Sequence, residues 1–249
     1  KITVFESVTH GKVLMIDGVV QLTERDEHIY HEMLVHVPML SHPKPKKVLI
    51  IGGGDGGALQ RVLMHPVTNV TLVDIDKQII ATSKKYFPSV CKNSFTDPRV
   101  HVLHEDGAEY VKNCTEVFDV IITDRGDPMG PVQTLFEKVF YQNCNKCLKK
   151  DGILVSLTGV PFMQGSELQE SVRILKSVFK INTCYLVPIP TYVGGTLAIT
   201  WSSNFISPQE INFKTLKTRY KKLVTNYYNP DIHLAAFALP NFIKKMIAV

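Results

Sequence analysis

The sequence lacks long apolar runs and contains few cysteines. No stretch approaches the roughly 18 apolar residues that a membrane-spanning helix requires, and the chain does not open on the basic and apolar pattern of a secretory signal. The five cysteines, at positions 91, 114, 144, 147 and 184, are odd in number and scattered, unlike a disulfide framework. We therefore expect a cytoplasmic protein that works in a reducing compartment and does not contact a membrane.

A concentrated basic surface is also missing. The formal net charge is +5, but the 28 Lys and Arg residues are spread along the chain and no basic run exceeds a few residues. Proteins that bind nucleic acid usually concentrate such charge on one face or in one stripe. We therefore expect no nucleic-acid partner.

The sequence shows no spacing typical of a metal site. His28, His31 and His36 fall with two glutamates on one predicted helix at 26–40, but their spacing scatters them around that helix. The C-x-x-C pair at 144–147 has no second pair near it, which favours reduced structural thiols over zinc or redox chemistry. We therefore predict no metal.

Beyond a stiff connector at 42–45, apolar runs alternate with helical segments. A chain of 249 residues, 45% hydrophobic and 20% charged, can bury the core of one large α/β domain. The apolar runs are continuous, as expected for strands of a parallel sheet that is covered on both faces. The predicted strands are Val48–Ile51, Val70–Val73, Val100–Leu103, Val117–Thr123, Ile153–Leu157, Ile181–Val187 and Thr196–Trp201. The predicted helices include 26–40, Ala58–Met64, Lys77–Tyr86 and Glu167–Phe179.

The N-terminal and C-terminal segments show patterns that differ from this alternation of strands and helices. Residues 1–23 alternate apolar and polar positions between glycine turns, which predicts a small antiparallel β element. Thr196–Trp201 follows a Gly-Gly turn too closely for a crossover helix, so it should pair antiparallel with the strand before it. The tail from Tyr227 predicts a loop and a closing helix. We therefore predict an α/β fold with a Rossmann-like, class I methyltransferase-type sheet, mostly parallel with its last strand antiparallel. A small N-terminal β domain at 1–25, incomplete at its start, should precede a catalytic domain at 26–249.

A glycine-rich run, GGGDGG at 52–57, lies directly after a predicted strand and directly before a predicted helix. Glycines let the backbone turn sharply there and approach a ligand, while the N–H groups of the helix point at it. The run also satisfies G-x-G-x-x-G, so a nicotinamide-dependent dehydrogenase stays open as an alternative. A glycine turn needed only for tight packing is a third interpretation.

Acidic residues follow the ends of successive predicted strands. They are Asp55, Asp74, Asp106, Asp124 and Asp127. Ligands of open α/β sheets bind outside the carboxyl ends of the strands, so these side chains should converge on one cleft, although each alone could be a helix cap. Clustered carboxylates repel a pyrophosphate and attract a cation. The pattern therefore favours a sulfonium nucleoside and a polyamine over a nicotinamide dinucleotide.

Five segments of the chain resemble one family. They are GVVQLTERDEHIYHEM (18–33), KKVLIIGGGDGG (46–57), FDVIITDRGDPMGP (118–131), IPTYVGG (189–195) and YYNPDIHLAAFALPNF (227–242). In combination they resemble the bacterial form of the spermidine synthases, the polyamine aminopropyltransferases, over essentially the whole chain. The resemblance implies a homodimer that transfers the aminopropyl group of decarboxylated S-adenosylmethionine, its co-substrate, to putrescine. The products would be spermidine and methylthioadenosine, with no tightly bound cofactor.

The same resemblance implies a role for each candidate residue. Asp124 matches the catalytic base. The residues that it places around the acceptor amine and the aminopropyl end of the donor are Gln21, Tyr30, His31, Asp55, Asp127 and Tyr192. The residues that it places around the nucleoside of the donor are Gly52, Gly54, Asp55, Asp74, Asp106, Gly107 and Pro131.

The implied chemistry is coherent with these residue types. An alkyl ammonium with a pKa of about 10.4 is a poor nucleophile at neutral pH and must lose a proton before it attacks. Asp124 would take that proton while Asp127 holds the other end of the diamine. An N-methyltransferase of a diamine and a catalytically weak paralogue that binds polyamine or nucleoside stay open. The choice among putrescine, cadaverine, agmatine and spermidine as acceptor is also open.

Four positions depart from the family pattern. Asp74 replaces a usual Glu, Arg125-Gly126 a pair of small polar residues, Leu157 a common Gln, and Val193 a frequent Pro or Tyr. A guanidinium about 4 Å from an ammonium would repel it by about 4 kcal/mol at an effective dielectric constant of about 20. We therefore expect Arg125 to point away from the cleft and to face solvent, an acidic side chain or a partner subunit. Its replacement by Ser should then change putrescine kinetics little.

Overall fold

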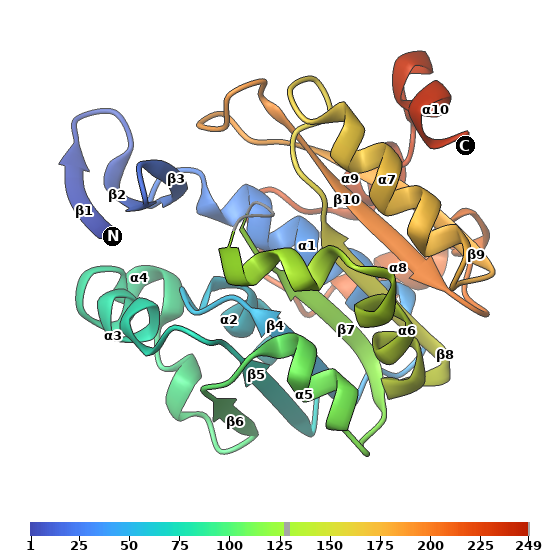
Figure 1. Ribbon diagram of the computed structural model, residues 1–249, viewed down its shortest axis with the longest axis horizontal. Coiled ribbons are helices and arrows are strands. Elements are labelled where there is room, and N and C mark those ends of the chain that lie inside the picture. Colours follow the sequence, from blue (N-terminus) through green and yellow to red (C-terminus); the bar gives the residue numbers. More distant parts are fainter. Residues whose placement is uncertain (127–129, 249) are drawn as a thin grey trace.

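The computed structural model describes residues 1–126 and 130–248, which form two separate sheets (Figure 1). The smaller is an antiparallel sheet of β1 (Ile2–Ser7), β2 (Gly11–Ile16) and β3 (Val19–Thr23), in that order. Asp17 and Gly18 both adopt positive φ in the tight turn between β2 and β3. The antiparallel element that the alternating pattern predicts is therefore confirmed. Figure 1 shows this sheet at one end of the molecule, with α1 leading from it into the main body.

The main sheet contains, within the described residues, seven strands in the order β6-β5-β4-β7-β8-β10-β9. Their bounds are β4 (Lys47–Gly52), β5 (Asn69–Val73), β6 (Val100–Leu103), β7 (Phe118–Asp124), β8 (Leu148–Leu157), β9 (Ile181–Pro188) and β10 (Thr196–Ser203). The pairs from β6 to β8 are parallel, whereas β10 is antiparallel to both of its neighbours. This confirms the predicted methyltransferase-type sheet. The pairing of β10 with β9 was predicted, but its insertion between β8 and β9 was not.

Helices cover both faces of the main sheet. Val48 and Ile50 of β4 join a core with α1 (Glu27–Ser41), α2 (Gly57–Leu63) and α8 (Phe213–Tyr220). Leu49 and Ile51 point to the opposite face, because successive side chains of a strand alternate. There they meet the second layer, which consists of α5 (Gly107–Asn113), α6 (Lys138–Cys147) and α7 (Gly165–Lys176). Burial on both faces explains why the strands are continuous apolar runs.

The remaining elements are short. They are α3 (Lys77–Tyr86), α4 (Pro88–Cys91), η1 (Ser94–Thr96), η2 (Gly130–Phe136), η3 (Pro208–Glu210), α9 (Pro230–Ala235) and α10 (Asn241–Ile247). The tail was predicted as a loop and one helix, yet it forms two helices. Asn229 caps α9 by accepting the N–H of Ile232 at 2.8 Å, and Pro230 occupies its first turn, a favourable position for proline. In the part of the chain that the structure describes, no helix has the length and apolar character needed to cross a membrane.

Three of the buried histidines, His36, His65 and His233, lie on α1 or against it. Nδ1 of His36 lies 2.9 Å from Nε2 of His65, and the hydroxyl of Tyr228 lies 2.7 Å from Nδ1 of His233. All three imidazoles are buried. Burial lowers the pKa of His36 well below its usual range and lowers the pKa values of His65 and His233 to about 4. These rings are therefore neutral in the folded protein at neutral pH.

The free energy of unfolding should fall as the pH drops from about 6.5 toward 4. In that window the unfolded chain takes up protons at these histidines and the folded chain does not, so protonation favours unfolding. His65 and His233 would each contribute up to about 3 kcal/mol for a pKa lowered to about 4. Urea unfolding between pH 7.5 and 4.5 measures the slope. His65→Gln should flatten it, whereas the exposed His101→Gln should not, and equal slopes for both variants would contradict the assignment.

Candidate active site

The carboxyl ends of the five parallel strands, β4 to β8, lie at one edge of the main sheet. In the registers of the sheet, Gly52 lies opposite Asp124 and Ile51 lies opposite Val73. The segments that follow β4, β5 and β7 are thereby brought together. This confirms the predicted convergence for Asp55, Asp74 and Asp124, whereas Asp127 lies outside the described residues.

The glycine-rich loop packs directly on two of these carboxylate-bearing strand ends. Gly52 has a φ of +81°, and a Cβ there would lie 2.0 Å from the carbonyl oxygen of Asp124. A Cβ on Gly54 would lie 2.6 Å from Oδ2 of Asp74, which accepts the N–H of Gly54 at 2.8 Å. Side chains are therefore excluded at both positions by the neighbouring strands. The glycines are needed for packing whether or not they also contact a ligand.

Asp124 has the most unusual environment of the three carboxylates. Its Oδ1 accepts a hydrogen bond from the hydroxyl of Tyr30, while its Oδ2 is buried without a partner among the described residues. Burial and the nearby charge of Asp55 raise the pKa of Asp124 to about 7, against the opposing effects of His31 and Tyr30. Asp124 can therefore take up a proton close to neutral pH, as a general base must.

His31 lies on α1 between two carboxylates. Its Nδ1 donates to Oε2 of Glu27 at 2.6 Å, and its Nε2 lies 3.3 Å from Oδ1 of Asp55. Burial alone would lower the pKa of His31, but Asp55 and Glu27 together raise it to about 10. The ring is therefore an imidazolium at neutral pH. Glu27 also accepts from Nη2 of Arg61 at 2.7 Å.

Sequence reasoning did not assign a role to Glu27 or Arg61. The i, i+4 spacing of Glu27 and His31 on one predicted helix was a usable signal, because such pairs lie on the same face. Nothing in the sequence marks Arg61 as the partner of Glu27, since α2 and α1 meet only through the tertiary fold.

One group of side chains in the described residues has a spacing suited to a metal ion. Ligand atoms of His31, Asp55 and Asp124 lie within 4.8 Å of one another. Of the helix histidines that the sequence analysis considered as metal ligands, only His31 belongs to this group. The raised pKa of His31 keeps a proton on each ring nitrogen at neutral pH, so an ion would first have to displace one of them.

Asp74 and Asp106 are held by backbone N–H groups. Asp74 accepts from Gly54 and from Asp76, both at 2.8 Å, and burial is the main cause of its raised pKa. Asp106 caps α5 by accepting the N–H of Ala108 at 2.7 Å. Asp106 therefore is a helix cap, one of the alternatives that its sequence position allowed. Gly107 follows it at the start of α5, where a Cβ would collide with Ile51.

Gln21 of the N-terminal sheet lies against the loop that carries Tyr192 and near Gly126. The hydroxyl of Tyr192 donates to the carbonyl oxygen of Gln21 at 2.9 Å, and Oε1 of Gln21 lies 3.8 Å from where a Cβ on Gly126 would be. The predicted neighbourhood of Gln21, Tyr30 and Tyr192 around Asp124 is consistent with these contacts. Pro131 belongs to η2, but its side chain lies outside the described residues.

Asp26, which the sequence did not single out, ties the same layers together. Its Oδ2 accepts from the backbone N–H of Thr191 at 3.1 Å and from its hydroxyl at 2.5 Å, and its Oδ1 accepts from Thr23 at 2.6 Å. One carboxylate thus joins the end of β3, the start of α1 and the loop that carries Tyr192.

Arg125 is buried rather than turned toward solvent, so the expectation of a solvent-facing side chain was wrong. Only 5% of the residue is exposed. The guanidinium stacks 3.5 Å from the ring centroid of Phe136 and donates to the carbonyl oxygen of Leu135, to the hydroxyl of Tyr141 at 2.7 Å and to the carbonyl oxygen of Leu157 at 3.5 Å. No carboxylate among the described residues pairs with it. Arginine tolerates such a site because its planar cation is weakly hydrated and stacks on aromatic faces.

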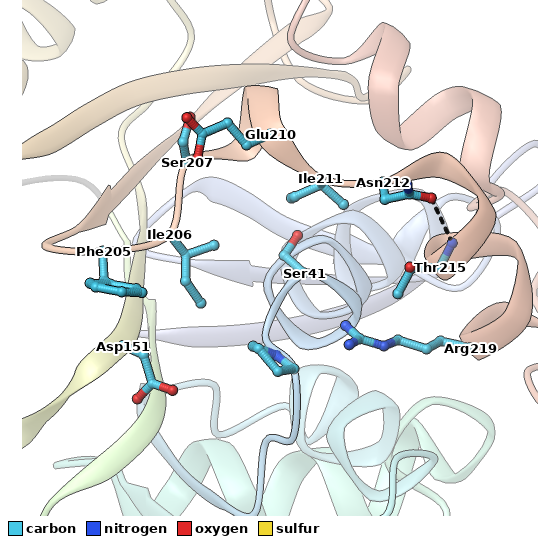
Figure 2. A pocket seen from close by; sticks show the side chains of 11 residues that line it. Ser41, Asp151, Phe205, Ile206, Ser207, Glu210, Ile211, Asn212, Thr215 and Arg219 are labelled. Carbon is cyan, nitrogen blue, oxygen red and sulfur yellow. Dashed lines mark hydrogen bonds between the residues drawn. The ribbon is translucent and has the colours of Figure 1, made fainter.

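A surface cavity lies at the other end of α1, away from these carboxylates. It has a volume of about 310 Å³ and is lined by residues that include Ser41, Asp151, Phe205, Glu210 and Arg219. Figure 2 shows side chains of both charges around it. Nη1 of Arg219 donates to two carbonyl oxygens at the end of α1, that of Leu40 at 2.7 Å and that of His42 at 3.0 Å. The cavity is at the amino edge of β8 and does not belong to the carboxylate site.

The sheet and its carboxyl edge are those of a methyltransferase-like enzyme, and comparison with known proteins narrows this class. Residues 27–215 match the model of the spermine/spermidine synthase domain, and residues 1–24 match that of the spermidine synthase tetramerisation domain. The chain belongs to the spermine/spermidine synthase family. It is accordingly a transferase, and the nicotinamide-dependent dehydrogenase is set aside.

Similar proteins span almost the whole chain. A polyamine aminopropyltransferase of Ruegeria sp. (strain TM1040) is 46% identical over 249 residues, which are 99% of this chain and 88% of the relative. Polyamine aminopropyltransferase 1 of Pseudomonas aeruginosa is 42% identical, covering 99% and 87%. A spermidine synthase solved in complex with the transition-state analogue AdoDATO has a TM-score of 0.94 and 41% identity, covering 99% and 84%. The spermidine synthase of Thermotoga maritima has a TM-score of 0.91 and 40% identity, covering 99% and 83%.

The buried setting of Arg125 leads to a stability prediction. Arg125→Ser would leave the carbonyl oxygens of Leu135 and Leu157 without their donor and would open a void beside Phe136. We expect the free energy of unfolding to fall by about 2–3 kcal/mol, as for the loss of buried hydrogen bonds to a charged group. Urea denaturation measures this loss. Arg173→Ser, which removes an exposed ion pair on α7, serves as the control and should change stability by less than about 0.5 kcal/mol. Similar losses for both variants would show that the buried contacts of Arg125 contribute little.

Proposed function

We propose that this chain transfers the aminopropyl group of decarboxylated S-adenosylmethionine to putrescine, with spermidine and methylthioadenosine as products. The observation that carries the proposal is the largely buried carboxylate of Asp124, with a pKa of about 7 and one oxygen that has no hydrogen-bond partner among the described residues. It lies at the carboxyl edge of the sheet, where open α/β sheets bind their ligands. Further support comes from the concentration of negative charge there, since Asp55 and Asp74 lie beside Asp124. Such a site attracts the cationic sulfonium and the diamine and repels phosphate.

The reaction follows from general base chemistry. One ammonium of putrescine gives its proton to Oδ2 of Asp124 and becomes a neutral amine. The nitrogen then attacks the propyl carbon bonded to sulfur, the carbon–sulfur bond breaks, and methylthioadenosine leaves as a neutral thioether. The proton on Asp124 passes to solvent before the next cycle. A base with a pKa near the operating pH is the most effective choice for this task.

The other candidate residues have proposed roles in binding. Asp74 would accept hydrogen bonds from the ribose hydroxyls of the donor, with Gly52, Gly54, Asp106, Gly107 and Pro131 around the rest of the nucleoside. Tyr30, Tyr192 and Gln21 would line the acceptor side, with Asp127 holding the far ammonium of the diamine. His31 and Asp55 would lie at the aminopropyl end of the donor.

We also propose a cytoplasmic homodimer. The match of residues 1–24 to a tetramerisation domain supports assembly through the N-terminal sheet. Exposed apolar side chains, Phe5 and Val19 on that sheet and Val8 in its β1–β2 turn, would be stabilised by contact with another subunit. A boundary near residue 25, between an N-terminal β domain and a catalytic domain at 26–249, fits the division into two sheets.

One assay tests the proposed function. The protein is incubated with decarboxylated S-adenosylmethionine and putrescine, and methylthioadenosine is measured together with spermidine; omission of putrescine serves as the control. We expect both products to appear in equal amounts. Methyl transfer from intact S-adenosylmethionine without methylthioadenosine from the decarboxylated donor would favour the N-methyltransferase. Ligand binding without either transfer would favour a catalytically weak paralogue.

Asp124→Asn and Asp74→Asn should separate catalysis from donor binding. An amide at position 124 is nearly isosteric but cannot take the proton, so kcat should fall by roughly 10²–10⁴-fold with donor affinity almost unchanged.

At position 74 the change to Asn removes a charged acceptor and one of the two backbone contacts. Donor affinity should then weaken by about 1.5–3 kcal/mol. Single-turnover rates and calorimetric binding of methylthioadenosine measure the two effects, and a normal rate for Asp124→Asn would remove it from the mechanism.

A further inference from the structure

Glu27 stands between two cations that would otherwise repel each other. Its Oε2 accepts from His31 at 2.6 Å and its Oε1 accepts from Arg61 at 2.7 Å. Glu27 and Arg61 are each about 8% exposed and His31 is fully buried. Little solvent reaches the three groups to screen them, so the carboxylate between the imidazolium and the guanidinium stabilises both.

The two nitrogens of His31 face different parts of the protein. Nδ1 faces Glu27, on the same helix, and Nε2 faces Asp55, whose carboxylate also accepts the N–H of Gly57 at 2.6 Å. The groups that bear charge or titrate around the ring and its partners come from every adjoining element. They are Glu27 and Tyr30 of α1, Arg61 of α2, Cys91 of α4, Asp55, Asp74 and Asp124 at the strand ends, and Tyr192 of the β9–β10 loop.

We propose that Glu27 is a positioning residue for the transfer reaction: braced by Arg61, it holds His31 as an imidazolium against Asp55, and this positive charge keeps Asp124 ionised and able to accept a proton. The inference rests on the proposed function and deepens it. Glu27 itself touches neither Asp124 nor the carboxylate of Asp55 and acts through His31.

The positions of the charges determine how loss of Glu27 would change the protonation of His31 and of Asp124. His31 is the cation that most favours the ionised form of Asp124, and it opposes the repulsion from Asp55 and Asp74. Without Glu27, the guanidinium of Arg61 would lie unpaired behind His31, and two like charges in a buried site disfavour each other. Of the two cations only His31 can lose its proton near neutral pH, because arginine stays charged. Loss of Glu27 should therefore neutralise His31, and Asp124 would hold its proton more tightly.

Kinetic pH profiles test this chain of effects. In Glu27→Gln, the acid limb of the kcat/KM profile for putrescine should move up by about one pH unit, so that the loss is about tenfold near pH 6.5 and small at pH 9. His31→Gln should shift the limb by a similar amount. Adding Glu27→Gln to His31→Gln should give no further shift, because Glu27 acts through the ring.

A matched control lies on the same helix. Glu32 is also buried, but its carboxylate accepts the backbone N–H groups of Asn226, Tyr227 and Tyr228 at 2.8–2.9 Å. Glu32→Gln should lower the melting temperature without moving the acid limb. A shift equal to that of Glu27→Gln would show that any damage to α1 has this effect, and the proposal would be abandoned.

The charge of His31 can be measured without any turnover. In protein labelled with ¹⁵N-histidine, the His31 signals, assigned by their loss in His31→Gln, should show an imidazolium at pH 8 in the wild type and a neutral ring in Glu27→Gln. A neutral His31 in the wild type at pH 8 would overturn the inference even if Glu27→Gln does not fold. Failure of the methylthioadenosine assay would instead overturn the proposed function and leave this measurement standing.

Discussion

Repulsion among the carboxylates of Asp55, Asp74 and Asp124 is the constraint on which the rest of this site depends. The parallel registers of β4, β5 and β7 bring the three groups together in a largely buried edge, where they cannot all ionise freely. Asp74 is stabilised by two backbone N–H groups and Asp55 by the imidazolium of His31. Asp124 receives only the hydroxyl of Tyr30 among the described residues. The negative charge that remains uncompensated raises the pKa of Asp124, which suits this residue to accept a proton.

The large elements and the position of the site were predictable from the sequence for physical reasons. Strands buried on both faces must be continuous apolar runs, so β4 to β7 were located to within a residue at each end. The carboxyl ends of parallel strands share one edge, which predicted where the aspartates would meet. β8 was underestimated, because its first half, from Leu148 to Gly152, is polar and carries no strand pattern.

Side-chain directions were less predictable, because they depend on contacts between segments far apart in the chain. Arg125 was expected to point away from the cleft and to face solvent, an acidic side chain or a partner subunit. Its guanidinium stacks on Phe136 and donates to backbone carbonyl oxygens, contacts that only the folded positions of η2 and β8 provide. Asp26 and Arg61 were overlooked for the same reason, since their partners Thr191 and Glu27 lie 165 and 34 residues away.

The insertion of β10 between β8 and β9 affects the order in which the strands can pair while the chain is being synthesised. During synthesis β9 emerges before β10, yet in the finished sheet β8 and β9 do not pair with each other. β10 pairs with both of them, and β8 also pairs with β7 on its other side. Until Ser203 has left the ribosome, β8 presents an unpaired backbone edge flanked by apolar residues. Such edges recruit strands of other chains. A chain released before Ser203 would therefore be prone to aggregate, because β10, the last strand in the sequence, is the one that covers the edge of β8.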